Sequence, residues 1–114
     1  DTDAETSDSI EEVSPEDKIE LQKQSELLNR TVDLYYSLTG IVSKLDTIDH
    51  LNIIANKINI QVKNNFIDLS DQLYKFITGP FKSNTYIKNL YIYNQFIESY
   101  KINIEMLRKI SAFE

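Results

Sequence analysis

This sequence has few of the side chains that zinc sites use most. His50 is the only histidine, and the chain has no cysteine. A zinc site would therefore need carboxylates for nearly all of its ligands, which is uncommon. Di-iron helical bundles repeat a Glu-x-x-His motif, but the residue three positions before His50 is Thr47 and there is no second histidine. We interpret His50 as a polar residue in the first turn of a helix, and we predict no metal centre.

The acidic and hydroxyl side chains do not form a recognisable catalytic set either. Paired carboxylates could act as acid and base, and Asp68, Asp71, Glu98 and Glu105 are the candidates. Glu98 and Glu105, however, fall on the outer side of a predicted helix. A serine or threonine nucleophile would have only His50 as its base. The two isolated glycines cannot form a loop that cradles phosphate. The sequence therefore predicts no enzyme, no cofactor and no small-molecule substrate.

The composition favours one helical domain. A chain of 114 residues is long enough for one core but not for two. Only two glycines and two prolines are present, which disfavours a β fold with many tight turns. The longest uncharged run, residues 34–43, is half of the roughly 20 residues needed to span a bilayer. We therefore expect a soluble protein with no membrane span.

Charge divides the chain into an arm and a body. Residues 1–17 contain eight acidic residues and no basic one, although the formal net charge of the whole chain is only −6. We predict a flexible acidic arm over residues 1–14 and a helical bundle domain over 15–114. Because the sequence begins with Asp rather than Met, we expect a processed chain. It could be cytoplasmic, or secreted after removal of a leader.

A first helix is predicted over residues 15–46. Ser14 can cap the free amides of its first turn, and Pro15 suits the first helical position. Gly40 lies inside the helical pattern without shifting its phase, so we expect one helix with a weak point of about 1 kcal/mol. Apolar residues recur every seven positions in two adjacent series, Leu21, Leu28, Tyr35 and Val42, and Leu27, Leu34, Ile41 and Ile48.

The end of this first helix is the least certain boundary. We place a turn at residues 46–49, where Thr47 or Asp49 could cap the next helix. The spacing of Leu45, Ile48 and Leu51 would also suit a helix that continues unbroken to residue 78. In that alternative the protein would be a long hairpin or an extended coil.

A second helix is predicted over residues 49–78, and its apolar residues fall on two faces. The main stripe is Leu51, Ile54, Ile58, Val62, Phe66, Leu69, Leu73 and Phe76. A second stripe lies on roughly the opposite side, with four residues spaced seven apart: Ile53, Ile60, Ile67 and Tyr74. Polar residues separate the two stripes on both flanks. The main stripe predicts a contact with the other helices of the bundle. The second stripe predicts a further contact on the opposite side of the helix.

A third helix is predicted over residues 85–112. Gly79 and Pro80 should end the second helix, because Gly can adopt the left-handed cap conformation and Pro cannot continue the hydrogen-bond ladder. In the third helix one apolar row alternates spacings of four and three: Tyr86, Leu90, Tyr93, Ile97, Tyr100, Ile104 and Leu107. Three helices of similar length with short connections predict an all-α antiparallel three-helix bundle, or helical coiled-coil module.

The second stripe is the one feature that predicts a function. Contiguous exposed apolar surface is unusual on a monomer and commonly marks an interface. We predict a non-enzymatic module that self-associates or binds a partner helix through Ile53, Ile60, Ile67 and Tyr74. The opposing interpretation is that this stripe is covered inside the same chain.

Two other functions remain open from the sequence. The abundance of Ile, Asn, Lys and Tyr is typical of AT-rich coding sequence, and a secreted effector or surface antigen that binds a host protein would also fit. The third helix carries Lys88, Lys101, Arg108 and Lys109, so nucleic-acid binding is a weaker alternative. The acidic arm opposes that alternative, because phosphate repels it.

Overall fold

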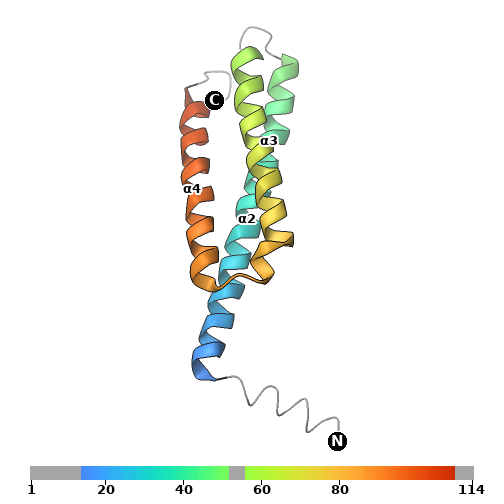
Figure 1. Cartoon of the computed structure of the whole chain (residues 1–114). Coiled ribbons are helices and arrows are strands. Elements are labelled where there is room, and N and C mark those ends of the chain that lie inside the picture. The colour runs from blue at the N-terminus through green and yellow to red at the C-terminus, as the bar shows by residue number, and fades with distance from the viewer. Residues whose placement is uncertain (1–13, 52–55, 110–114) are drawn as a thin grey trace, which may run out of the picture.

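The computed structural model describes residues 14–51 and 56–109, with the backbone alone for residues 48–51 and 56–59. Helix α2 spans Pro15–Leu51, α3 spans Asn56–Thr78 and α4 spans Tyr86–Arg108. A short 3-10 helix, η1, covers Pro80–Lys82 between α3 and α4. Figure 1 shows the three long helices side by side in an up-down-up arrangement. The predicted all-α three-helix bundle is confirmed.

The predicted turn at residues 46–49 is wrong, because α2 continues through it to Leu51. Thr47 caps no new helix; its hydroxyl donates to the Ser43 carbonyl at 3.3 Å, one turn back in α2. The apolar spacing persists here and no Gly or Pro interrupts it, so nothing stops the helix. His50 consequently lies in the last turn of α2, and the second helix begins at Asn56 rather than 49.

The alternative of one unbroken helix is also wrong, because α2 and α3 run antiparallel beside each other. The rings of Tyr35 and Tyr74 lie 5.8 Å apart, centroid to centroid. Farther along, Asp46 and Lys63 form an ion pair. From the first contact to the second, the residue number rises on α2, from 35 to 46, and falls on α3, from 74 to 63. The chain therefore reverses direction between Leu51 and Asn56.

The helix ends follow from local chemistry. Ser14 caps α2 as predicted, with its hydroxyl accepting the Asp17 N–H at 3.1 Å. Thr85 caps α4 by accepting the Lys88 N–H at 3.3 Å. Gly79 does follow α3 but is not left-handed, with φ −126°. A Cβ at Gly79 would lie only 3.1 Å from the Lys75 carbonyl oxygen, so close approach favours glycine there.

The core sits between the three helices and draws most heavily on α2 and α3. The predicted main stripe of α3 is confirmed where its side chains are described, because those residues are buried in this core. On α4, the predicted apolar row contacts the core, but most of its members are only partly buried. The α4 helix ends at Arg108, and residues 110–112 of the predicted helix lie outside the described residues. The buried apolar residues are Leu27, Leu34, Leu38, Leu45, Val62, Phe66, Leu69, Leu73, Phe76, Phe81, Tyr93 and Leu107.

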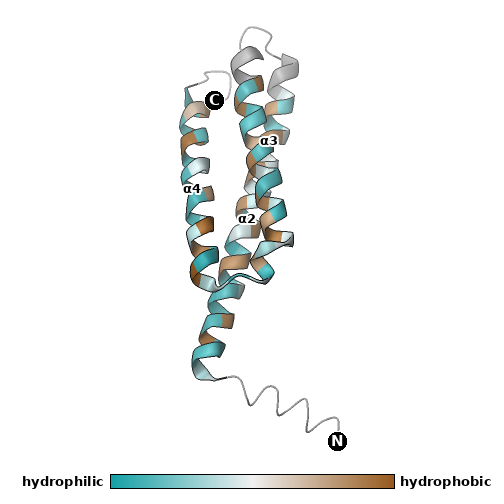
Figure 2. Ribbon diagram, viewed as in Figure 1, coloured by the Kyte–Doolittle hydropathy of each residue, from teal (hydrophilic) through white to brown (hydrophobic). Residues whose placement is uncertain are grey.

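The first turns of α2 project beyond the bundle (Figure 1). Gln24 marks the level at which α4 begins, because its amide donates to the Asn84 carbonyl at 3.0 Å. Residues 15–23 are all exposed, and Figure 2 shows this projecting part as mostly hydrophilic. Leu21 is 62% exposed, so this first member of its seven-residue series does not reach the core. We call residues 15–23 the overhang.

Candidate protein-binding surface

The second stripe of α3 is solvent-accessible in the part that the structure describes. Ile60 is 44% exposed and Tyr74 is 54% exposed. Ile67 is half-buried and lies outside the buried core cluster. Ile53 lies outside the described residues. The stripe is therefore distinct from the core face of the same helix, as its sequence position predicted.

The second stripe runs along the edge of α3 next to α2, away from α4. Tyr74 is in ring contact with Tyr35 of α2. On the other edge of α3, Gln72 lines a surface cavity together with Phe96 of α4. Since these two contacts mark different sides of one helix, α4 does not cover the stripe. The side of α3 that carries the stripe has α2 as its neighbour.

Helix α2 adds aromatic surface to this edge. Tyr35 is half-buried, and its ring lies 5.9 Å from that of Tyr36, which is 66% exposed. The two helices are antiparallel, so the residue seven positions after Tyr35 on α2 lies level with the residue seven positions before Tyr74 on α3. Val42 is therefore level with Ile67. We call the following six residues the α2–α3 seam: Tyr35, Tyr36, Val42, Ile60, Ile67 and Tyr74.

The sequence could not identify the α2 part of this seam. The seven-residue pattern predicts that Tyr35 and Val42 lie on the core face, and both are partly buried against the core. Tyr36 belongs to neither seven-residue series, and a single exposed tyrosine has no periodic signal. Its role follows from which side of α2 faces α3, and that depends on the three-dimensional pairing. The seven-residue series through Tyr35 and Val42 was the only available hint.

The six seam residues are uncharged, but one ion pair joins α2 and α3 within the length of the seam. It is the pair of Asp46 with Lys63, and their side chains are 54% and 23% exposed. This pair is neutral overall and lies between the level of Val42 with Ile67 and the level of Ile60. The surface thus presents aliphatic and aromatic groups beside a compensated pair of charges. Such a surface suits another protein better than it suits a charged polymer.

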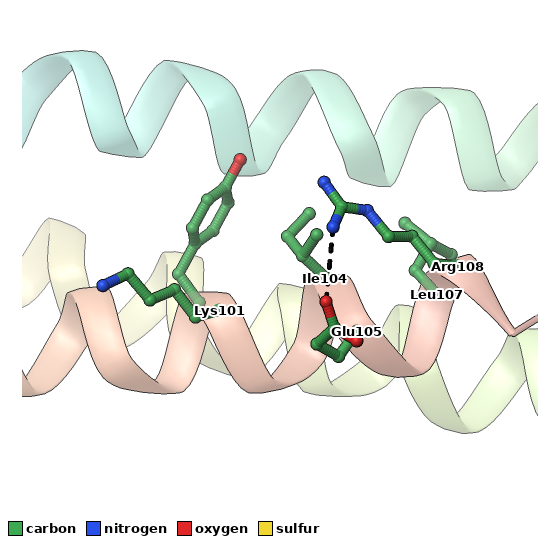
Figure 3. A pocket seen from close by; sticks show the side chains of 6 residues that line it. Lys101, Ile104, Glu105, Leu107 and Arg108 are labelled. Atoms are coloured by element: carbon green, nitrogen blue, oxygen red, sulfur yellow. Dashed lines mark hydrogen bonds and ion pairs between the residues drawn. The ribbon is translucent and has the colours of Figure 1, made fainter.

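A second concave region lies beside the C-terminal half of α4 (Figure 3). It is an open cavity of about 650 Å³, with an apolar floor that includes Ile104 and the buried Leu107. In Figure 3, Ile104 and Arg108 extend from α4 toward the neighbouring helix. Arg108 is paired with Glu105, N to O, at 3.2 Å. The remaining lining residues are Tyr100 and Lys101.

The charges on α4 largely compensate one another. Lys101 pairs with Glu98 at 3.7 Å, and Arg108 pairs with Glu105 one turn later. A continuous positive strip, which phosphate binding requires, does not result from these residues. The arrangement gives no support to the nucleic-acid alternative.

The four candidate acidic residues form no catalytic or metal site in the part of the chain that the structure describes. Asp68, Asp71, Glu98 and Glu105 are all exposed. Among residues 14–51 and 56–109, no group of three or more metal-ligating side chains is positioned to hold an ion. Within the same described ranges, none of the helices is both long and apolar enough to cross a membrane. The side chain of His50 lies outside the described residues.

Comparison of the chain with protein-family models, curated proteins and solved structures gives no match. The functional proposal therefore depends on the surface itself. The feature on which the proposal rests is the apolar seam between α2 and α3, although α4 also exposes Ile87, Tyr91 and Ile102.

Proposed function

We propose that this chain is a non-enzymatic protein–protein interaction module that associates through the α2–α3 seam, either with itself or with a partner helix. The observation that carries the proposal is the alignment of exposed Ile60 and Tyr74 along α3, with exposed Tyr36 beside them on α2. Single exposed apolar residues are ordinary on protein surfaces. A row of them along one edge of a helix pair, separate from the core, favours an interface.

The chemistry of the seam supports this function. Tyrosine provides a large, rigid contact area with a hydroxyl that tolerates water, and it is enriched at interfaces. Ile60 and Ile67 lie seven residues apart, two helical turns, which matches the spacing at which a partner helix presents its own apolar side chains. Because Ile60 is already more than half buried, covering the rest of its side chain would stabilise a complex by about 1 kcal/mol. The six seam residues themselves bring no charge to be desolvated, and the Asp46–Lys63 pair that lies among them is already internally compensated.

The proposal is tested by Ile60→Asp, with Ile102→Asp as its matched control. Ile102 is 61% exposed and lies on α4, away from the seam. In dilute solution both variants should unfold within about 0.5 kcal/mol of the wild type in urea, because neither site is in the core. In extracts of cells that make the chain, the wild type should elute as a complex larger than 13.3 kDa.

Only Ile60→Asp should shift the chain toward 13.3 kDa in that extract. The proposal fails if Ile60→Asp unfolds the dilute chain, because the stripe then belongs to the core. It also fails if Ile102→Asp disrupts the complex while Ile60→Asp does not.

A further inference from the structure

We infer that the groove between α3 and α4 binds an extended peptide segment of a partner protein, with a basic side chain of that segment beside Asp68. The groove consists of two hollows of about 260 and 320 Å³. Leu69, Gln72 and Ser99 line both hollows, which therefore form one continuous groove. It lies on the other edge of α3 from the α2–α3 seam, so this inference goes beyond the proposed function and does not depend on it.

The groove has the length and the floor that a short peptide needs. Its lining on α4 runs from Ile92 to Met106, which is about 21 Å at 1.5 Å per residue. About six residues of an extended chain cover that length. The buried Leu69 and the half-buried Phe96 provide apolar groups on which a peptide side chain can pack.

Amide side chains from both helices line the groove. Gln72 of α3 and Gln95 of α4 line one hollow, and Asn65 and Asn103 line the other. Within the described part of the chain, the side chains of Asn65, Gln72 and Gln95 form no hydrogen bond. Each amide offers a donor and an acceptor, as does each peptide unit of an extended chain. A helical partner would leave these amides unused, because its backbone groups bond to each other.

The spacing of the polar residues on α4 fits an extended backbone. Gln95, Ser99 and Asn103 are four residues apart, so each step along the helix is about 6 Å. An extended chain advances about 6.2–6.8 Å for every two residues. Asn103 donates its side-chain nitrogen to the Ser99 carbonyl at 2.8 Å, which leaves its side-chain oxygen as an acceptor. Successive polar groups can therefore meet every second residue of the peptide.

Charge favours a basic segment. Asp68 is the one charged side chain among the described residues that line the groove. It is exposed and forms no ion pair within the described ranges, whereas Glu98 and Glu105 of α4 are each paired with a cation on the same helix. A lysine or arginine of the partner would make a charge-assisted hydrogen bond with Asp68. The formal net charge of −6 also attracts a basic segment and repels an acidic one.

The inference is tested with a pool of random octapeptides passed over the immobilised full chain. Sequencing of the retained peptides should show lysine or arginine enriched at one position, next to an apolar residue. Asp68→Asn should abolish the preference for a basic residue, because it removes the charge and keeps the shape of the side chain. The matched control is Glu98→Gln, which removes a charge on α4 outside the groove and should leave the preference unchanged.

The most strongly retained peptide, labelled with fluorescein, then gives a Kd by fluorescence anisotropy. Gln72→Ala should raise this Kd about fivefold, because one hydrogen bond to the peptide is lost. Gln61→Ala, at an exposed position of α3 outside the groove, should leave it within about twofold. Ile60→Asp should also leave it within about twofold, because the seam lies on the other edge of α3. Circular dichroism should show the same helix content in every variant, because all of these side chains except that of Ile60 are exposed polar groups and Ile60 lies outside the core.

Three results would overturn the inference. The first is that the wild type retains no peptide, or retains an oligosaccharide instead. The second is that neither Asp68→Asn nor Gln72→Ala changes peptide binding. The third is that Ile60→Asp abolishes peptide binding, which would place the peptide at the seam. That third result would retain the proposed function, and the first two leave the test of the seam unaffected.

Discussion

Asn89 connects three elements of the fold through a fully buried amide. Its side-chain nitrogen donates to the Gln24 side-chain oxygen of α2 and to the Phe81 carbonyl of η1, each at 3.0 Å. Its oxygen accepts from the Asn84 side chain at 3.1 Å. A buried polar group is stabilising only when its bonds are made, and here all three are made. The network fixes where α4 starts relative to α2.

We predict that Asn89→Ala lowers the free energy of unfolding by about 2–3 kcal/mol. The substitution leaves the polar atoms of Gln24, Phe81 and Asn84 without this partner in a partly buried site. Urea unfolding followed by circular dichroism measures the change. Asn94→Ala, at an exposed position of the same helix, is the control and should stay within about 0.5 kcal/mol. A loss below that value for Asn89→Ala would show that the network does not stabilise the fold.

At this residue scale the sequence predicts apolar burial better than polar burial. The described members of the main α3 stripe, such as Phe66 and Leu73, are fully buried as their periodicity indicates. Asn89 carries no such signal, because an asparagine on a helix usually faces water. Its burial depends on the Gly79–Thr85 connection, which brings Phe81 and Asn84 against it. The spacing of apolar residues along a helix does not predict this contact with a connecting segment.

At the scale of elements, α2 is longer than α3 and α4, and its first turns extend beyond them. The overhang, residues 15–23, has its core-side positions occupied by polar residues such as Glu20 and Lys23. Capping by Ser14 and favourable charges in the first turn stabilise its start. The Lys23 ammonium lies over the Tyr86 ring of α4, 5.7 Å from the ring centre, and a helix this short with so little tertiary contact is marginally stable. The overhang should therefore open locally without unfolding of the rest.

We predict that amide hydrogen exchange distinguishes the overhang from the central part of α2. Amides of residues 20–23 should exchange on the order of 100-fold faster than those of residues 34–45, because opening the overhang exposes no buried core. Mass spectrometry of proteolytic fragments, or NMR, resolves the two segments. Equal protection in both segments would contradict the prediction and would mean that the overhang is covered in solution.

The element boundaries show what periodicity can and cannot determine. Gly40 lies inside α2 without ending it, as the continuous apolar phase indicates. The same continuity also carries α2 past residues 46–49, where polar cap residues suggested a turn. Thr47 there bonds within its own helix, so a residue that can cap does not do so when the helical pattern continues. Where Gly79 and Pro80 follow α3, the predicted boundary is confirmed.

At the scale of the whole molecule, the scarcity of Gly and Pro and the three long apolar patterns were sufficient to predict the three-helix bundle. The side of α3 that faces α4 could not be predicted, because both of its stripes are apolar. The ring contact of Tyr35 with Tyr74 places α2, rather than α4, beside the second stripe. With only three helices in the bundle, one edge of the α2–α3 pair is left without a neighbour among the described residues. The proposed interface is a consequence of that arrangement.

The most direct measurement is hydroxyl-radical footprinting of the tyrosines in the assembled chain and in the dilute single chain. Tyr36 and Tyr74 lie on the seam, whereas Tyr91 is comparably exposed on α4 and serves as an internal control. We predict that assembly lowers the oxidation rates of Tyr36 and Tyr74 by about threefold or more and leaves that of Tyr91 unchanged, because an interface core excludes water. Protection of Tyr91 with Tyr36 and Tyr74 fully reactive would contradict the proposed interface.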